Sequence, residues 1–277
     1  GALNLANGWR ALYYNTTGTR NTAVGFKALY SNATASENTA VGVEALQQNT
    51  TGVGNCALGR QALHNNTTAS SNTGMGLYAL YANTTGSNNT AFGRSASEGN
   101  TTANSNTSIG YQALKQTSTG ASNVAVGADA LTDNTTGDNN VAVGKGALEV
   151  ATTAGNNVAV GRGALDSTTT GARNAGVGYF ALDANTTGER NTAVGDSAGY
   201  STTTGYRNTF LGFSARGDSA TSNNEISIGY DVRGIGSGYA TLGYGGTKSY
   251  INLGYTSWGG TSDSRLKDNI TTSTVGL

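Results

Sequence analysis

Hydrophobic and polar residues follow one spacing from Gly8 to Gly229. Glycine recurs every 17 residues over thirteen intervals without an insertion, and the residue before it is apolar in thirteen of fourteen cases. Counting from this glycine as position 0, Ala at +3 and Thr at +9 occur in all thirteen repeats, Leu at +4 in ten, and Asn at −4 in thirteen cases before Glu225 breaks the column. The consensus is Asn-Thr-Ala-Val-Gly-x-x-Ala-Leu-x-x-Asn-Thr-Thr-Gly-x-x. A single repeated unit therefore accounts for most of the chain.

Each repeat is predicted to be one coil of a parallel β-solenoid. Seventeen residues are too few for a helix–turn–helix repeat. The short apolar run Thr-Ala-Val is bounded by turn formers, as a buried strand is, and Asn-Thr-Thr-Gly has the composition of a turn. The complete absence of Pro fits, because every coil must donate its N–H groups to a neighbouring coil. Thirteen coils spaced about 4.8 Å apart would make a rod of roughly 60 Å.

Alternation along each strand predicts which side chains fill the coil. The residues at −1, such as Val24, Val41 and Val126, and the Leu column at +4 are expected to point inward. The column at −2 is mostly Ala and Gly, for example Ala23 and Ala40, and is expected on the opposite face. Small residues on an outer face indicate close contact with a second surface, so we expect self-association through this column.

The Asn and Thr columns are interpreted as structural ladders. Asn side chains at −4 are expected to bond to the neighbouring coil, and Thr17, Thr34 and their successors to stack at a turn. The alternative for the Thr column is ice binding by a flat array. Its position beside Asn and Gly in a turn-like segment favours the structural interpretation.

Composition and charge narrow the function classes. Sixteen basic and sixteen acidic residues give zero net charge, which argues against nucleic-acid binding, and no apolar run is long enough for membrane insertion. One His and one Cys exclude a zinc cluster within the chain, so no metal or cofactor is expected. Cys56 is interpreted as a small buried side chain.

Enzymatic activity is not expected either. The acidic residues are interpreted as scattered and not laddered, so no pair stands out for glycoside hydrolysis. These residues are Asp129, Glu149, Asp166 and Asp183.

Aromatic side chains at variable positions are candidate binding residues. They are expected to be exposed, where they could stack on sugars of a host receptor. The alternative is plain edge packing along a β rod. The candidates are Trp9, Phe26, Tyr111, Tyr179 and Phe213.

The spacing ends after Gly229, and we divide the chain there. Residues 1–229 are predicted to be the solenoid shaft. Residues 230–260 are Tyr- and Gly-rich at irregular spacing and are predicted to be a β cap. Residues 261–277 form a third segment.

That third segment contains Ser262-Asp-Ser-Arg-Leu-Lys267-Asp-Asn-Ile270. It resembles the opening of the endosialidase-type intramolecular chaperone, the S74 peptidase family, which follows many phage tail spikes and fibres. The resemblance implies one self-cleavage after trimer assembly, with Ser262 as nucleophile and Lys267 as its general base. It covers about the last sixteen residues.

The repeat Asn-Thr-Ala-Val-Gly-x-x-Ala-Leu is similar to the head repeat of trimeric autotransporter adhesins. This resemblance implies left-handed β-rolls packed as a homotrimeric fibre. Taken together, the two resemblances imply a phage tail fibre in the virion tail that attaches to a host surface receptor, for which a polysaccharide is one candidate. The alternative is a trimeric adhesin or extracellular filament at a bacterial surface.

Overall fold

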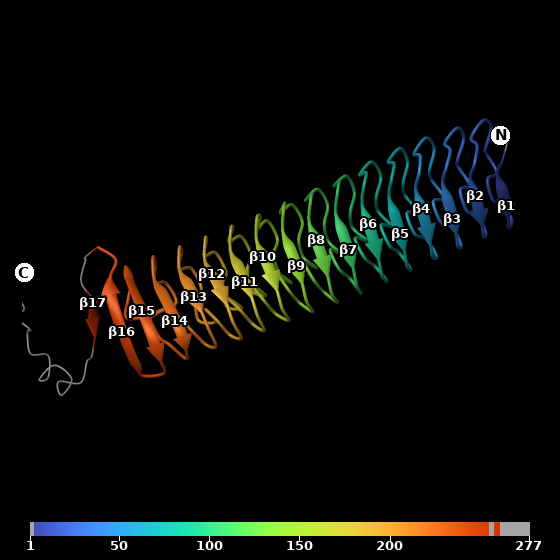
Figure 1. Ribbon diagram of the computed structural model, residues 1–277. Coiled ribbons are helices and arrows are strands. Elements are labelled where there is room, and N and C mark those ends of the chain that lie inside the picture. Colours follow the sequence, from blue (N-terminus) through green and yellow to red (C-terminus); the bar gives the residue numbers. More distant parts are fainter. Residues whose placement is uncertain (1–2, 255–257, 261–277) are drawn as a thin grey trace, which may run out of the picture.

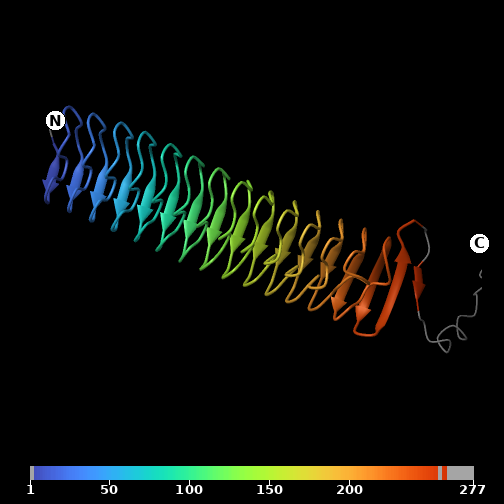
Figure 2. The same cartoon turned by 180° about the vertical axis from the view of Figure 1, so that it is seen from behind.

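The described residues form a straight rod of stacked coils, with the first and the last strands at opposite ends (Figures 1 and 2). A computed structural model describes residues 3–254 and 258–260. Within these residues there are seventeen β-strands and no helix. The predicted all-β solenoid of 17-residue coils is therefore confirmed.

Thirteen three-residue strands, one from each successive coil, build most of the sheet, and four further strands follow at the C-terminal end. The strands are β1 (Leu5–Asn7), β2 (Thr22–Val24), β3 (Thr39–Val41), β4 (Cys56–Leu58), β5 (Thr73–Met75), β6 (Thr90–Phe92), β7 (Thr107–Ile109), β8 (Val124–Val126), β9 (Val141–Val143), β10 (Val158–Val160), β11 (Ala175–Val177), β12 (Thr192–Val194), β13 (Thr209–Leu211), β14 (Ile226–Tyr230), β15 (Tyr239–Tyr244), β16 (Thr247–Asn252) and β17 (Trp258–Gly260).

Equivalent residues of successive coils lie directly above one another. From β1 to β14 each strand pairs in parallel with the next strand in the chain, shifted by one repeat. Val24 pairs with Val41, and Val41 pairs with Leu58. One step of 17 residues thus returns the backbone to the same place one strand spacing further along the rod.

The recurring glycine is required by both its backbone angle and its surroundings. Gly127, for example, has a φ of +137°, a region that residues with a Cβ rarely adopt. A Cβ at Gly127 would lie 2.5 Å from the carbonyl oxygen of Gly144 in the next coil. This explains why no other residue occupies position 0.

The assignment of strand faces from the sequence is wrong by one residue. Ala23 at −2 and Leu29 at +4 are completely buried, whereas Leu58 and Phe92 at −1 are 44% and 54% exposed. The Leu column points inward as predicted, but its partner inside the coil is the Ala column and not the Val column.

The narrow lumen explains the small residues at −2. At Gly74, an added Cβ would already lie 3.3 Å from Cγ of Leu63. The Ala column therefore faces Leu across the lumen, where a Val side chain would not fit. Its small size reflects the interior of a single coil, so it is not evidence for a second surface.

The repeat changes after β14. β15 still runs parallel to β14, but Ile226 pairs with Ala240, a shift of fourteen residues instead of seventeen. β16 then runs antiparallel to β15, and β17 antiparallel to β16. This change in register and direction falls where the glycine spacing ends.

Candidate functional site

The outward side of the sheet is a continuous surface along the rod. Side chains at −3 and −1 of β2 to β14 form two files along it, which we call the outer face. No residue of these two files is charged. The exposed apolar members at −1 include Leu58, Phe92, Ile109, Val143, Val160, Val177 and Val194.

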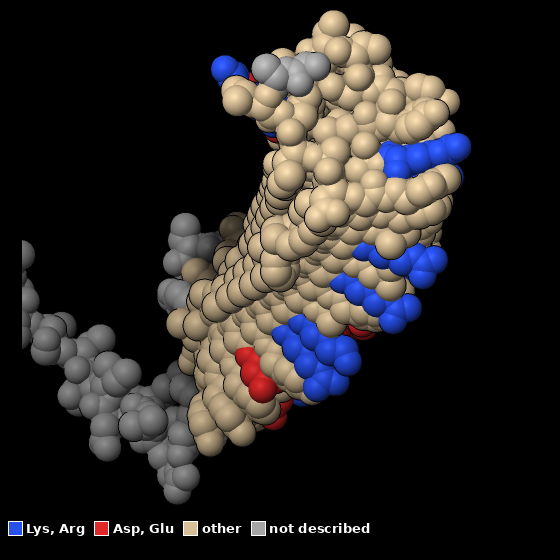
Figure 3. Space-filling view, turned by 90° about the vertical axis from the view of Figure 1, so that its right-hand side faces the viewer, with Lys and Arg blue, Asp and Glu red and all other residues tan. Residues whose placement is uncertain are grey.

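Charged residues lie elsewhere on the rod. Figure 3 shows Lys and Arg side chains gathered along one edge, while most of the visible surface is uncharged. The −3 file is Thr at seven of its thirteen positions, whereas the −1 file is apolar throughout. A continuous apolar file along a rod of roughly 60 Å exceeds the scattered apolar residues of an ordinary monomer surface.

Cys56 belongs to this outer face. It lies at −3 in β4 and is a free thiol of intermediate exposure. The prediction of a buried Cys56 is therefore wrong, because position −3 shares the outward side of the strand with position −1.

The five candidate aromatic residues lie in one file at position +1. Each is more than 40% exposed, as expected. Trp9 and Phe26 stack on each other with ring centroids 4.9 Å apart, and Phe213 stacks on Tyr230 at 5.0 Å. Because these ring faces cover one another, edge packing accounts for Trp9, Phe26 and Phe213 better than sugar stacking does.

The other two candidates are flanked by arginine. The Arg94 guanidinium lies 5.8 Å from the ring of Tyr111. Tyr179 packs edge-on against Phe180 at 4.3 Å and lies 5.7 Å from the Arg162 guanidinium. The structure therefore does not bring all five aromatics into one site.

Two Asn files, both buried, hold the coils together. At −4, the N–H of Asn38 donates to Oδ1 of Asn21 at 3.0 Å, and Nδ2 of Asn38 donates to the carbonyl of Gly52 at 2.8 Å. These amides thus bond mainly to the main chain. A ladder between side chains lies instead at +7, where Nδ2 of Asn49 donates to Oδ1 of Asn32 at 3.0 Å.

The Thr file at +9 is exposed and lies outside the strands. In the neighbouring file at +8, hydroxyls donate to carbonyls of the next coil, as Thr50 does to Thr67 at 3.0 Å. This placement in a turn favours the structural interpretation of these residues over ice binding.

Three carboxylates form a ladder that the sequence interpretation missed. Glu149, Asp166 and Asp183 occupy position +5 in three successive coils, so their spacing equals the repeat itself. Burial raises the pKa of each carboxyl, and Asp166 adds to the rise for Glu149 and Asp183. Describing these residues as scattered was wrong.

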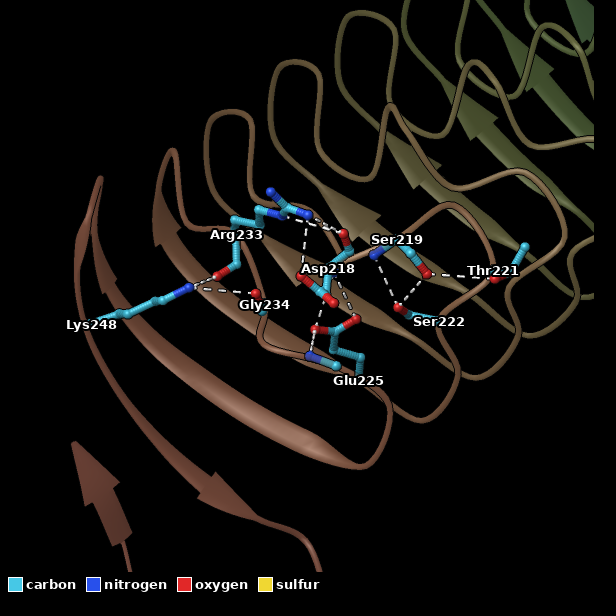
Figure 4. A network of polar contacts seen from close by, with 9 residues as sticks. Asp218, Ser219, Thr221, Ser222, Glu225, Arg233, Gly234 and Lys248 are labelled. Carbon is cyan, nitrogen blue, oxygen red and sulfur yellow. Dashed lines mark hydrogen bonds and ion pairs between the residues drawn. The ribbon is translucent and has the colours of Figure 1, made fainter. Parts of the chain in front are cut away.

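Glu225 ends the Asn file at −4 inside a polar network (Figure 4). It is fully buried, and its carboxylate accepts the N–H groups of Asp218 at 3.1 Å and Gly236 at 3.1 Å. Arg233 pairs with Asp218 at 3.2 Å and not with Glu225. Burial raises the pKa of Glu225, although the two N–H groups oppose this. The network joins the last coil to the segment before β15.

The predicted self-cleavage residues Ser262 and Lys267 lie outside the described residues. Within residues 3–254 and 258–260, no group of His, Cys, Asp and Glu could hold a metal ion. In that same part of the chain, no helix could cross a membrane. No protein-family model, curated protein or solved structure matches the chain.

Proposed function

We propose that this chain forms the shaft of a homotrimeric fibre that attaches a phage tail to a host surface. The observation that carries the proposal is the outer face, which runs along the rod without a charged side chain. Large exposed apolar strips in soluble proteins mark interfaces with other molecules. A second copy of the chain offers a strip of the same length and chemistry.

Three copies are proposed because both family resemblances imply a trimer. Identical rods that meet through one face can close by rotation about the fibre axis. The Ala column does not support this association, because it lies inside the coil. We assign the contact between chains to the Val column at −1 instead.

A shaft made in this way would be a mechanical element. Each coil contacts only its neighbours, so stability accumulates along the rod by repetition. The Asn files add hydrogen bonds from every coil to the next. A stiff rod of this kind suits a virion tail that must hold a receptor-binding surface away from the particle.

The second candidate is a trimeric adhesin or filament at a bacterial surface, favoured by the likeness of the repeats to autotransporter heads. The sequence that the gene encodes after Leu277 separates the two. A chaperone segment there supports the phage fibre, whereas a membrane anchor supports the adhesin.

The trimer can be tested by placing charge on the outer face. Lys in place of Ile109, Val143 and Val177 should yield folded monomers, because buried lysines without partners oppose association. The matched control places Lys at the exposed positions Thr119, Thr153 and Thr187 of the same coils. Light scattering should give three times the chain mass of 27.9 kDa for the wild type and the control. A monomeric wild type would overturn the proposal.

A further inference from the structure

A groove runs along another side of the rod, from the coil of Gly144 to the end of the solenoid. It consists of three hollows of about 170, 240 and 220 Å³. Phe180 lines both the first and the second hollow, and Tyr200 lines both the second and the third. The hollows therefore follow one another, separated by aromatic side chains.

Small residues at +2 open this groove. Gly146 and Gly163 occupy that position in the first hollow, and Ser197 and Ser214 in the second. The ring of Phe180 folds over Gly163, where an added Cβ would lie 2.3 Å from a ring carbon. The groove is thus deeper at these Gly and Ser residues, on both sides of the Phe180 ring.

The carboxylate ladder lines one wall. Glu149 and Asp166 face the first hollow and Asp183 the second. None of the three forms an ion pair within the described residues. Oδ1 of Asp183 is buried and accepts no hydrogen bond. These acceptors are already partly desolvated and are available to a ligand that brings hydroxyl donors.

The charges that line the groove cancel. Four are positive and four are negative, and two aromatic rings stand between them. The cations are Lys145, Arg162, Arg216 and Arg233, and the anions are Glu149, Asp166, Asp183 and Asp218. A polyanion would meet carboxylates in all three hollows, and a polycation would meet Lys or Arg in the first and the third. A neutral ligand with many hydroxyls would find acceptors, donors and apolar ring surfaces in alternation.

We propose that this groove binds a neutral saccharide chain. The hydroxyls of the sugar would donate to Asp166 and Asp183, in charge-assisted hydrogen bonds. Its apolar faces would pack on Phe180 and Tyr200. The inference rests on the proposed function, because it assigns the receptor class of an attachment fibre. No residue of the outer face lines the groove, so the two proposed surfaces use different side chains.

The test measures binding of the intact protein to a panel of neutral hexose and N-acetylhexosamine oligosaccharides, with uronic-acid oligosaccharides alongside. At least one neutral member should bind. The double variant Asp166→Asn, Asp183→Asn and the variant Phe180→Ala should each weaken that binding at least about tenfold, the loss of one good interaction.

The matched control is Glu98→Gln, which makes the same kind of change at the same position +5 outside the groove. It should bind like the wild type. Binding of no neutral member, preference for the uronic-acid oligosaccharides, or binding unaffected by the groove variants would each overturn the saccharide site. A trimer that binds no sugar would contradict this inference alone, whereas a monomeric wild type would contradict the proposed function.

Discussion

Inside the coil, departures from the consensus occur in matched pairs. Where Leu is missing at +4, the residue eleven positions later at −2 also departs from Ala or Gly. The pairs are Ser97 with Ser108, Gly199 with Phe210, and Arg216 with Ser227. The Ser97 hydroxyl donates to the Ser108 hydroxyl at 2.9 Å. A Cβ at Gly199 would lie 2.7 Å from the Phe210 ring. The first two pairs therefore each share one space in the lumen, whereas the Arg216 side chain pairs with Asp231 outside it.

This shared space predicts the outcome of a double substitution. Phe210→Ala should lower the free energy of unfolding by about 3–5 kcal/mol, because it leaves a cavity. Gly199→Leu alone should also destabilise the rod by overpacking against the ring. The two changes together restore the consensus pair and should recover most of the loss, since Leu182 already adopts a similar φ of +54° at the same position. Chemical unfolding of the four proteins measures this, and a double variant no better than Phe210→Ala would contradict it.

The width of the lumen also explains why the inward-facing residue of each strand could not be predicted from the sequence. Period, strand position and the inward Leu column follow from spacing alone. The choice between Ala23 and Val24 as the inward residue depends on the width of the lumen, which spacing does not contain. The eleven-residue matching of Gly199 with Phe210 was the available signal for it.

Among the structural elements, the ladder of Asn side chains at +7 is interrupted. Thr117 stands between Asn100 and Asn134, and its hydroxyl is buried without a hydrogen-bond partner. Oδ1 of Asn100 instead accepts the N–H of Ala103 within its own coil. The file therefore lacks the link from Asn100 to Asn134, and Thr117 is the first of several interruptions, since Ala151 and Thr168 follow at the same position.

Thr117→Asn should restore this link and stabilise the rod by about 1 kcal/mol, the net worth of a typical hydrogen bond. Thr119→Asn, at an exposed corner of the same coil, is the control and should change little. Thermal unfolding followed by circular dichroism compares the two. Equal or lower stability of the Thr117→Asn protein would show that the amide ladder does not hold coils together.

The carboxylate ladder makes stability depend on pH. Burial raises the folded-state pKa of Asp166 above its ordinary value of 3.8, and Glu149 and Asp183 shift in the same direction. Carboxyls with raised folded-state pKa values favour folding while protonated, and that contribution is lost as pH rises through those values. Lys145 offsets part of the shift only for Glu149.

Asp166→Asn should therefore raise the melting temperature at neutral pH. The gain should shrink as pH falls through the raised folded-state pKa toward 3.8, because the wild-type carboxyl then becomes neutral as well. Melting curves at several pH values test this. A gain that is independent of pH would mean that charge in the ladder is not its cause. The ladder itself could have been found in the sequence, because its members are one repeat apart, whereas their burial and the adjoining hollows needed the structure.

For the whole molecule, the rod has two sides with different chemistry. The outer face is uncharged, with one apolar file beside a file rich in Thr, whereas the groove is charged, aromatic and hollowed. A fibre needs both kinds of surface, one to join its chains and one to meet its target. The network around Glu225 connects neighbouring segments where the repeat stops. The outer face could be assigned only after the structure showed which side chains of each strand point outward.

The reactivity of Cys56 tests most directly whether the outer face is covered by further copies. It is the only thiol in the chain and lies within this face, half-exposed in a single rod. In the native protein it should react with an aromatic disulfide reagent much more slowly than in the Lys variant at 109, 143 and 177. A native thiol that reacts as fast as that of the monomeric variant would contradict an interface on this face.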